Sequence, residues 1–419
     1  MSSSLLLLIV GLAILASLGF DIWLDRRQIR WLAAHRDDVP AAFAERVTPE
    51  EHRRAVDYAV ERLRLSMLDS VVGAALSALL LIGGLFAALT KLATEIAGPG
   101  YVAGLLLVGA VMLIYAVLEI PFAAWRTFRI EQRYGFNRTT VGVFVADLAK
   151  GAVLAVAIGA PFILAIDYIM RHAGTVWWLA GWGFYIAFSL LMLLIVPRFI
   201  MPLFNKFEPI DDAALRTRIE TLLARCGFHA SGLFKMDGSK RSSHGNAFFT
   251  GFGPTKRIVL FDTILSSLTP SEIEAVLAHE LGHFKLRHIV KRMATGFAVS
   301  LVAFAVIGYL VGSGWFAAGF GIVPETAQAM PLVALILCML VMPAFTGWTK
   351  GISNWRSRLH EWEADAYAAR QTNGADLASA LLKLHKDNAS PGTTDPIYSA
   401  FKYSHPPTAE RIARLQQAA

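Results

Sequence analysis

Two histidines and a glutamate lie close together in the segment AVLAHELGHFKLRH, which spans residues 275–288. His279 and His283 are four residues apart, so on a helix they lie one turn apart on one face, where two imidazoles can bind one metal ion. Glu280 directly follows the first histidine and can reach a metal-bound water as a general base. In a chain with 11 histidines and 32 acidic residues, about 0.02 such matches are expected by chance. The pattern therefore predicts a zinc site that catalyses hydrolysis.

The residues before this motif predict the helix that must carry it. Thr269 can cap the helix, Pro270 suits its first position, and Glu272 completes a capping box with Thr269. The stretch Ser271–Arg292 contains one glycine and no proline. We therefore expect one continuous helix there.

A catalytic zinc ion usually has three protein ligands and one open position for water. The segment SRLHEWEADAYAAR, residues 357–370, is the best source of the third ligand. Glu361 and Asp365 are four residues apart and share a helix face, whereas Glu363 points away from that face. We predict Glu361 as the third ligand, and Asp365 as an acceptor that fixes the tautomer of a ligand histidine. The alternative is an amphipathic helix with an ordinary charged face.

The composition places these segments in a membrane protein. The chain of 419 residues is 55% hydrophobic and only 17% charged, with a mean hydropathy of +0.50, which is too apolar for a soluble enzyme. The first span lacks a positively charged start, so we expect it to be retained and not cleaved as a signal peptide. We predict about seven spans: Ser4–Leu24, Leu68–Ala88, Tyr101–Ala123, Phe144–Ile166, Val176–Ile195, Ala294–Phe316 and Met330–Trp348.

The loops between the spans predict the orientation. Arginines are concentrated in the first and third loops, whereas the alternate connections carry few positive charges. The first and third loops, the long polar segment and the C-terminal segment are therefore expected on the cytoplasmic side of a cytoplasmic or inner membrane. Glu119, Asp147 and Lys150 fall inside predicted spans, which indicates a structural ion pair, a misplaced span boundary or a bundle that encloses water.

These patterns divide the chain into four parts. Residues 1–197 hold five spans, and residues 294–349 hold the sixth and seventh. Residues 198–293 and 350–419, which hold the predicted zinc ligands, form the two parts of a cytoplasmic domain.

Several classes of protein are disfavoured. The two cysteines, Cys226 and Cys338, predict neither a disulfide framework nor a cysteine metal site. The net charge of +7 suits cytoplasmic loops, and without a basic run interleaved with aromatic residues we expect no nucleic-acid partner. No internal repeat indicates the paired halves of a transporter. The alanine- and arginine-rich composition suggests a bacterial source.

Several ordered blocks resemble the type I CAAX prenyl proteases, which are integral-membrane zinc endopeptidases. The resemblance extends from residue 128 to the C-terminus, and the N-terminal residues 1–100 share only the pattern of spans. The blocks are FRIEQRYGFNRTT, PLFNKFEPI, DGSKRSSHGNAFFTGFGPTKRIVLFDTIL, HELGH, SNWRSRLHEWEAD and YSHPPTAERI.

The resemblance implies a mainly α-helical membrane protein. About seven transmembrane helices would surround a water-filled chamber, which an α+β, zincin-like peptidase domain closes on the cytoplasmic side. It also assigns roles to individual residues. His279, His283 and Glu361 match the zinc ligands, Glu280 matches the catalytic base, Asn246, Ala247 and Phe248 match an edge strand that aligns the substrate, and His405 and Arg411 match residues that line the reaction centre.

Physical reasoning supports some of these roles. An extended peptide can add to a free strand edge through main-chain hydrogen bonds, so Asn246–Phe249 can hold a substrate largely independently of its sequence. His405 can donate to the oxyanion of the tetrahedral intermediate, although the alternative is a loop histidine fixed by the two prolines that follow it. For His244 and His288 we expect only a turn residue and a surface helix residue.

We therefore predict a membrane-embedded endopeptidase with one Zn²⁺ per chain. Its partners would be membrane lipids and peptide or protein substrates, cleaved in flexible or C-terminal, CAAX-like segments with or without a lipid modification. One alternative is a quality-control protease for damaged membrane proteins. The alternative outside enzymes is a transporter or channel, suggested by the charges within the spans.

Overall fold

The computed structural model describes residues 2–228, 232–250 and 257–417. Seven of its described helices are long and apolar enough to cross a membrane. This confirms the predicted number of spans. Some of them continue through short 3₁₀ or π-helical turns. They are α1 (Ser3–Ala34), α2 (Pro49–Leu81), α4 (Tyr101–Trp125) with η2 (Arg126–Glu131), α5 (Val141–His172), α6 (Trp177–Ile195) with η3 (Gly174–Val176), η4 (Val196–Ile200) and α7 (Met201–Phe204), α11 (His288–Gly312), and α14 (Leu332–Thr346) with η7 (Gly347–Thr349) and α15 (Lys350–Gln371).

Two span boundaries differ from the prediction because glycines end the helices early. The second span was expected to reach Ala88, but α2 ends at Leu81 and a separate helix, α3 (Leu85–Ala97), follows Gly84. The sixth was expected to reach Phe316, but α11 ends before Gly314, which precedes α12 (Trp315–Gly319). Gly84 and Gly314 have φ angles of 75° and 68°, a conformation that glycine adopts at little cost.

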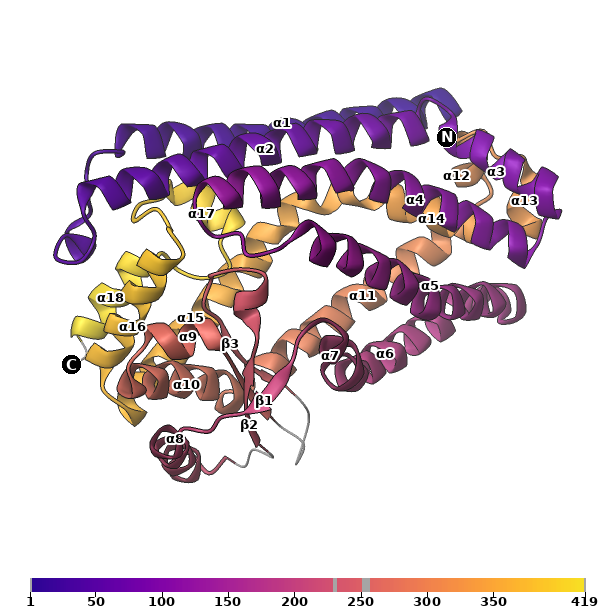
Figure 1. The fold of residues 1–419 in the computed structure, drawn as a ribbon. Helices are drawn as coiled ribbons and strands as arrows, with labels where there is room; N and C mark the ends of the chain where they lie inside the picture. The colour runs from indigo at the N-terminus through magenta and orange to yellow at the C-terminus, as the bar shows by residue number, and fades with distance from the viewer. Residues whose placement is uncertain (1, 229–231, 251–256, 418–419) are drawn as a thin grey trace.

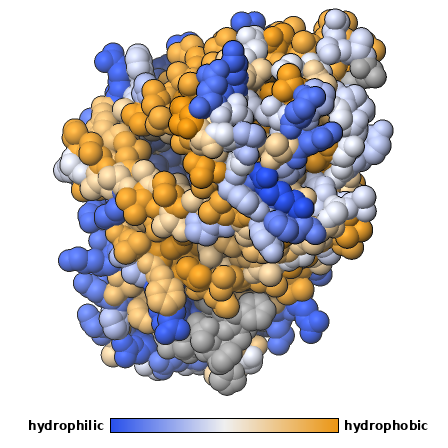
Figure 2. Space-filling model, turned by 90° about the vertical axis from the view of Figure 1, so that its right-hand side faces the viewer, coloured by the Kyte–Doolittle hydropathy of each residue, from blue (hydrophilic) through white to orange (hydrophobic). Residues whose placement is uncertain are grey.

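The long helices form a closed ring. Each contacts the next in the order α1, α2, α4, α5, α6, α11 and α14, and α14 returns to α1. Figure 1 shows their ends meeting on the side that carries the N-terminus, α3, α12 and α13 (Pro324–Ala329), with the C-terminus at the opposite end. There an apolar core that includes Leu6, Phe86, Leu107, Phe316 and Cys338 fills the ring. Figure 2 shows apolar side chains over much of that face of the molecule.

A small mixed sheet lies at the other end of the molecule. Its strand order is β1-β2-β4-β3, in which β2 and β4 are parallel and the other two pairs are antiparallel. The strand β3 therefore lies at one edge. The strands are β1 (Phe207–Pro209), β2 (Gly232–Met236), β3 (Ala247–Thr250) and β4 (Arg257–Phe261).

Short helices complete this part of the chain around a second apolar core. The core includes Ile219, Leu260, Leu277, Ala368 and Leu415, so segments far apart in the sequence share it. The helices are α8 (Ala213–Arg225), α9 (Asp262–Ser267), α10 (Pro270–Lys285), α16 (Gly374–Asp387), α17 (Pro396–Lys402) and α18 (Thr408–Gln417), with the 3₁₀ turns η1 (Ala41–Phe43) and η5 (Gly238–Lys240).

Hydrogen bonds join the membrane helices to this second part. Arg241 donates to both carboxylate oxygens of Asp147 at 2.8 and 3.0 Å, so this charge within a span belongs to an ion pair. Lys150 donates to the Leu203 carbonyl oxygen at 2.8 Å, whereas Glu119 lies 3.9 Å from Arg126. The charges in the spans thus include an ion pair that links α5 to this second part.

The loops expected on one side of the membrane do lie together. In the first loop region, Arg54 donates to the Tyr134 carbonyl oxygen of the third loop at 2.6 Å. The backbone of Arg138 in the third loop bonds to that of Arg241 at 3.1 Å. The two cysteines, Cys226 and Cys338, are free and buried.

The helices α10 and α15 of the second part pack closely against each other at Gly282. A Cβ atom placed on Gly282 would lie 3.1 Å from Ala364 Cα and 3.2 Å from both Ala364 O and Tyr367 Cβ. Those distances are shorter than ordinary van der Waals contacts, and two of the three atoms belong to the backbone. Glycine at position 282 therefore allows the two helices to approach this closely.

We predict that Gly282→Ala lowers stability by about 1–3 kcal/mol because the added methyl group overpacks the interface. Thermal unfolding in detergent measures the change. Gly183→Ala is the matched control, since this helical glycine on α6 has no atom within 4 Å of the added methyl group. An unchanged unfolding temperature for Gly282→Ala would contradict the close packing of α10 and α15.

Candidate metal centre

The helix α10 begins as the sequence predicts. Thr269 accepts a hydrogen bond from the Glu272 backbone at 3.4 Å, and Glu272 accepts one from the Thr269 backbone at 2.7 Å. The predicted continuous helix over Ser271–Arg292 is wrong, however, because α10 ends at Lys285 and Arg287 adopts a left-handed conformation with φ 56°. The chain turns there, and α11 starts in a new direction at His288.

The two helices α10 and α15 bring the three predicted metal ligands together. The Nε2 atoms of His279 and His283 are 3.2 Å apart. Glu361 lies against both, with Oε2 at 3.4 Å from His279 Nε2 and Oε1 at 3.4 Å from His283 Nε2. His279, His283 and Glu361 thus form one group that can hold a metal ion.

The spacing of these atoms fits a tetrahedral zinc ion. Zinc binds imidazole nitrogen and carboxylate oxygen at about 2.0–2.2 Å, which separates neighbouring ligand atoms by about 3.3–3.6 Å. In addition, Glu361 is 4% exposed, and its Oε2 atom is buried without a hydrogen-bond partner. A buried carboxylate oxygen without a partner is costly, and a bound cation would remove that cost.

Asp365 and Arg411 support His279 from behind. Asp365 Oδ1 lies 2.7 Å from His279 Nδ1. The Nδ1 atom thus faces a carboxylate, and Nε2 points toward the other two ligands. Arg411, from α18, donates to both oxygens of Asp365 at 2.6 and 2.8 Å and is itself buried. Burial disfavours charge on His279, but the adjacent carboxylates of Asp365 and Glu361 outweigh it and raise the pKa of the imidazole to about 9. A metal ion must therefore displace a proton from this imidazole.

Glu280 lies beside the group without being tied to it. It makes no hydrogen bond or ion pair within the part of the chain that the structure describes. Burial raises the pKa of its carboxyl group, although the neighbouring His279 and His283 act in the opposite direction. A raised pKa brings a carboxylate closer to the value that suits a general base near neutral pH.

His405 reaches the group from the connection between α17 and α18. Its Nε2 lies 3.4 Å from Glu361 Oε1, and its Nδ1 lies 3.0 Å from the Ser404 hydroxyl. The side chain is 63% exposed, so one face is open while the other touches the metal group. The surrounding protein partly desolvates the imidazole, and this lowers its pKa, which favours a neutral ring that carries one N–H donor.

The expectation for His288 as a surface residue is wrong, because the turn at Arg287 folds it back onto His283. His288 is 1% exposed. Its Nδ1 lies 3.0 Å from His283 Nδ1, and its Nε2 lies 2.8 Å from the carboxylate of Glu363. His360 stacks on it with ring centroids 4.1 Å apart. Because this contact depends on a break in the helix, residue spacing gave no sign of it.

These contacts assign the protons if His283 is a metal ligand. His283 Nε2 must then carry the lone pair, so its Nδ1–H donates to His288 Nδ1. The proton of His288 lies on Nε2 and is donated to Glu363. His288 and Glu363 therefore orient His283 in the way that Asp365 and Arg411 orient His279.

The remaining predicted residues belong to β3 and to the segment that precedes it. Asn246 precedes the edge strand β3, which contains Ala247 and Phe248. The part of the matching block at 251–256 lies outside the described residues. His244 lies between η5 and β3, where its Nδ1 is 2.9 Å from Asn388 Oδ1 and its ring stacks on Phe136.

Two protein families match the chain. Residues 28–206 match the CAAX prenyl protease N-terminal family with five membrane helices, and residues 209–419 match peptidase family M48. The CAAX prenyl protease 1 homolog of Oryza sativa subsp. japonica is 34% identical, over 95% of this chain and 94% of that protein. The chain belongs to the CAAX prenyl protease 1 family. It is thus a multi-pass membrane metallopeptidase, and the transporter or channel alternative has no support.

Other members of the CAAX prenyl protease 1 family match at similar levels. The Saccharomyces cerevisiae enzyme is 31% identical over 98% of this chain and 94% of that protein. The crystal structure of S. mikatae Ste24p superposes with a TM-score of 0.91 at 30% identity, covering 98% of each chain. These relatives are eukaryotic, so the expected bacterial source has no support.

We predict that His288→Ala weakens zinc affinity about 10–100-fold, because outer hydrogen-bond partners of metal ligands contribute on this scale. Glu363→Gln should weaken it less, since an amide oxygen still accepts the hydrogen bond from His288. Competition with a chelator of known affinity measures the change.

The control for these variants is His172→Ala, which removes a histidine on α5 that bonds only to its own helix backbone at Tyr168. Equal zinc affinities for His288→Ala and this control would exclude the orienting role.

Proposed function

We propose that the chain is a zinc-dependent endopeptidase that cleaves flexible, C-terminal segments of prenylated proteins. The observation that carries the proposal is the group of His279, His283 and Glu361, whose ligand atoms lie 3.2–3.4 Å apart. The substrate class is supported by the names of the relatives, which are CAAX prenyl proteases. C-terminal CAAX sequences direct prenylation of the cysteine.

In this proposal the three ligands hold one zinc ion per chain. When bound, zinc polarises the scissile carbonyl and lowers the pKa of its water. Glu280 then removes a proton from the attacking water and later transfers it to the leaving amine. Its carboxylate is suited to this role because no described residue holds it in a hydrogen bond.

Two further elements position the peptide and stabilise charge. The strand β3 lies at the edge of the described sheet, so an extended substrate can add to the sheet beside β3. His405 presents its exposed ring next to Glu361, where a neutral N–H can donate to the oxyanion as it forms. Arg411 acts indirectly, by holding Asp365 and through it His279.

We further propose that the ring of helices encloses a water-filled chamber, with the peptidase part on the cytoplasmic side. In the apolar windows of α6 and α11, only 6% of residues are buried. Such low burial supports helices that expose an inner as well as an outer face. The cytoplasmic side is supported by the arginine-rich loops, which contact one another and the peptidase part.

We predict that Glu280→Gln keeps zinc but loses peptide hydrolysis by at least about 10²–10⁴-fold, the usual contribution of a general base. Metal analysis and cleavage of a prenylated CAAX peptide measure the two properties. His279→Ala should lose both. Glu274→Gln is the matched control, because Glu274 lies on the same helix but pairs with Arg218 and Arg225. Activity of Glu280→Gln within about tenfold of the parent would assign the base elsewhere.

We also predict that the chamber admits flexible chains and excludes folded ones. One target sequence placed in a flexible C-terminal tail should be cleaved much faster than in a tightly folded loop, because only a tail can thread inward and pair with β3. Equal rates would mean an open site. Comparing the prenylated tail with an unmodified one also distinguishes a CAAX protease from a quality-control protease, which would not require the lipid.

A further inference from the structure

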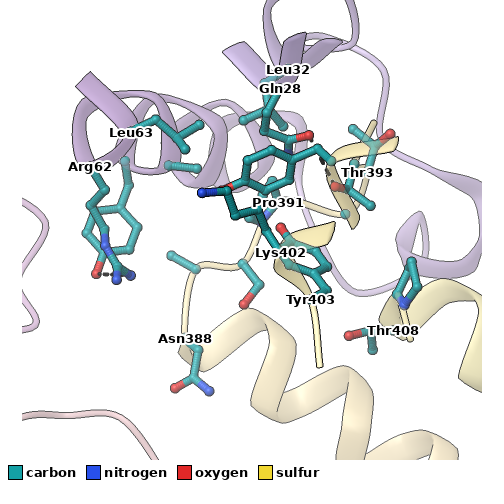
Figure 3. A pocket seen from close by; sticks show the side chains of 18 of the residues that line it. Gln28, Leu32, Arg62, Leu63, Asn388, Pro391, Thr393, Lys402, Tyr403 and Thr408 are labelled. Atoms are coloured by element: carbon teal, nitrogen blue, oxygen red, sulfur yellow. Dashed lines mark hydrogen bonds between the residues drawn. The ribbon is translucent and has the colours of Figure 1, made fainter. Parts of the chain in front are cut away.

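A cavity of about 630 Å³ opens beside the metal group. On one side it is lined by α1 and α2, and on the other by the loop after α16 and by the connection that carries His405. Figure 3 shows Arg62 extending from α2, across from Asn388 and Thr408 of the C-terminal segments. Because His405 lines the cavity and also touches Glu361, a ligand there lies next to the reaction centre.

The charges of the cavity are one-sided. Its described lining contains the cations Arg62, Arg126 and Lys402 but no aspartate or glutamate. Lys402 is already paired with Asp21 at 2.6 Å, and Arg126 lies near Glu119 at 3.9 Å. The cavity therefore favours an anionic ligand.

Of these three cations, Arg62 has N–H donors that no described carboxylate accepts from. Its guanidinium lies over the Tyr58 ring at 5.3 Å and donates only a long hydrogen bond of 3.4 Å to the Tyr58 hydroxyl. No described carboxylate lies within ion-pairing distance of it. Tyr58 in turn donates to Glu131 at 2.6 Å, which fixes the ring beneath the guanidinium. An arginine held on an aromatic ring with its donors free is well suited to bind a carboxylate through two parallel hydrogen bonds.

We propose that Arg62 binds the C-terminal carboxylate of the substrate in this cavity. The inference rests on the proposed function, because only a few residues separate the cysteine of a CAAX tail from its free carboxylate. A peptide whose scissile bond lies at the metal group and whose end enters the cavity would place that carboxylate among the cations. Because the cavity has a fixed position relative to the metal group, binding of the carboxylate there selects bonds that lie a set number of residues from the chain end.

The test compares two peptides of one sequence, one ending in a free carboxylate and one in a carboxamide. Their kcat/KM values and their binding to zinc-loaded Glu280→Gln protein are measured in neutral detergent. We expect the carboxylate peptide to be favoured about tenfold to a hundredfold, the range for a hydrogen bond to a charged group. Arg62→Gln should reduce this ratio to nearly one, and Arg62→Lys should give an intermediate ratio.

Arg64→Gln is the matched control, since Arg64 is an exposed arginine on the same helix that does not line the cavity, and it should keep the full ratio. Equal ratios for the parent and Arg62→Gln, or an equal loss in Arg64→Gln, would overturn the proposal. If Arg62 instead holds an anionic lipid headgroup, the two peptides bind equally in neutral detergent, which also overturns it. Loss of hydrolysis with carboxylate-dependent binding intact would refute the endopeptidase but keep the subsite.

Discussion

The close approach of α10 and α15 at Gly282 is the constraint on which the metal group depends. Two histidines on one helix leave a range of possible metal positions. The carboxylate on the second helix must come within a few ångströms of them to complete the group. Any side chain at position 282 would meet the backbone of Ala364. The glycine in HELGH therefore has a geometric purpose, although it contributes no functional group.

The close approach of α10 and α15 buries ionisable groups, and removing them from water costs free energy. Oppositely charged partners from the rest of the peptidase part offset this cost. The buried carboxylates of Glu361 and Asp365 face the imidazole of His279 and the guanidinium of Arg411. Because Arg411 comes from α18, the C-terminal helix is part of the centre. The centre is thus completed only when segments from both ends of the peptidase part have folded.

Local rules predicted the parts of the molecule that local forces determine. The capping box at Thr269, the seven apolar spans and the shared face of Glu361 and Asp365 follow from residue spacing over a few turns. The left-handed turn at Arg287 does not, because no glycine or proline marks it, and the burial of His288 against Glu363 depends on that turn. Likewise, the ion pair between Asp147 and Arg241 joins residues far apart in sequence. That His405 and Arg411, on the segments around α17 and α18, lie at the site was predicted only from the family resemblance.

The metal ligands are connected to the membrane in two mechanically different ways. Glu361 lies on the helical segment Leu332–Gln371, which includes the seventh candidate span, whereas the turn at Arg287 separates both histidines from α11. Glu361 lies about 20 Å along its helix from Trp348, so a change of about 5° in the tilt of the segment displaces it by about 2 Å. Since tilt adjusts to hydrocarbon thickness, this helical segment couples the position of Glu361 to the thickness of the surrounding lipid. Because the turn at Arg287 separates the histidines from α11, they move with Glu361 only through the packing of α10 on α15 at Gly282.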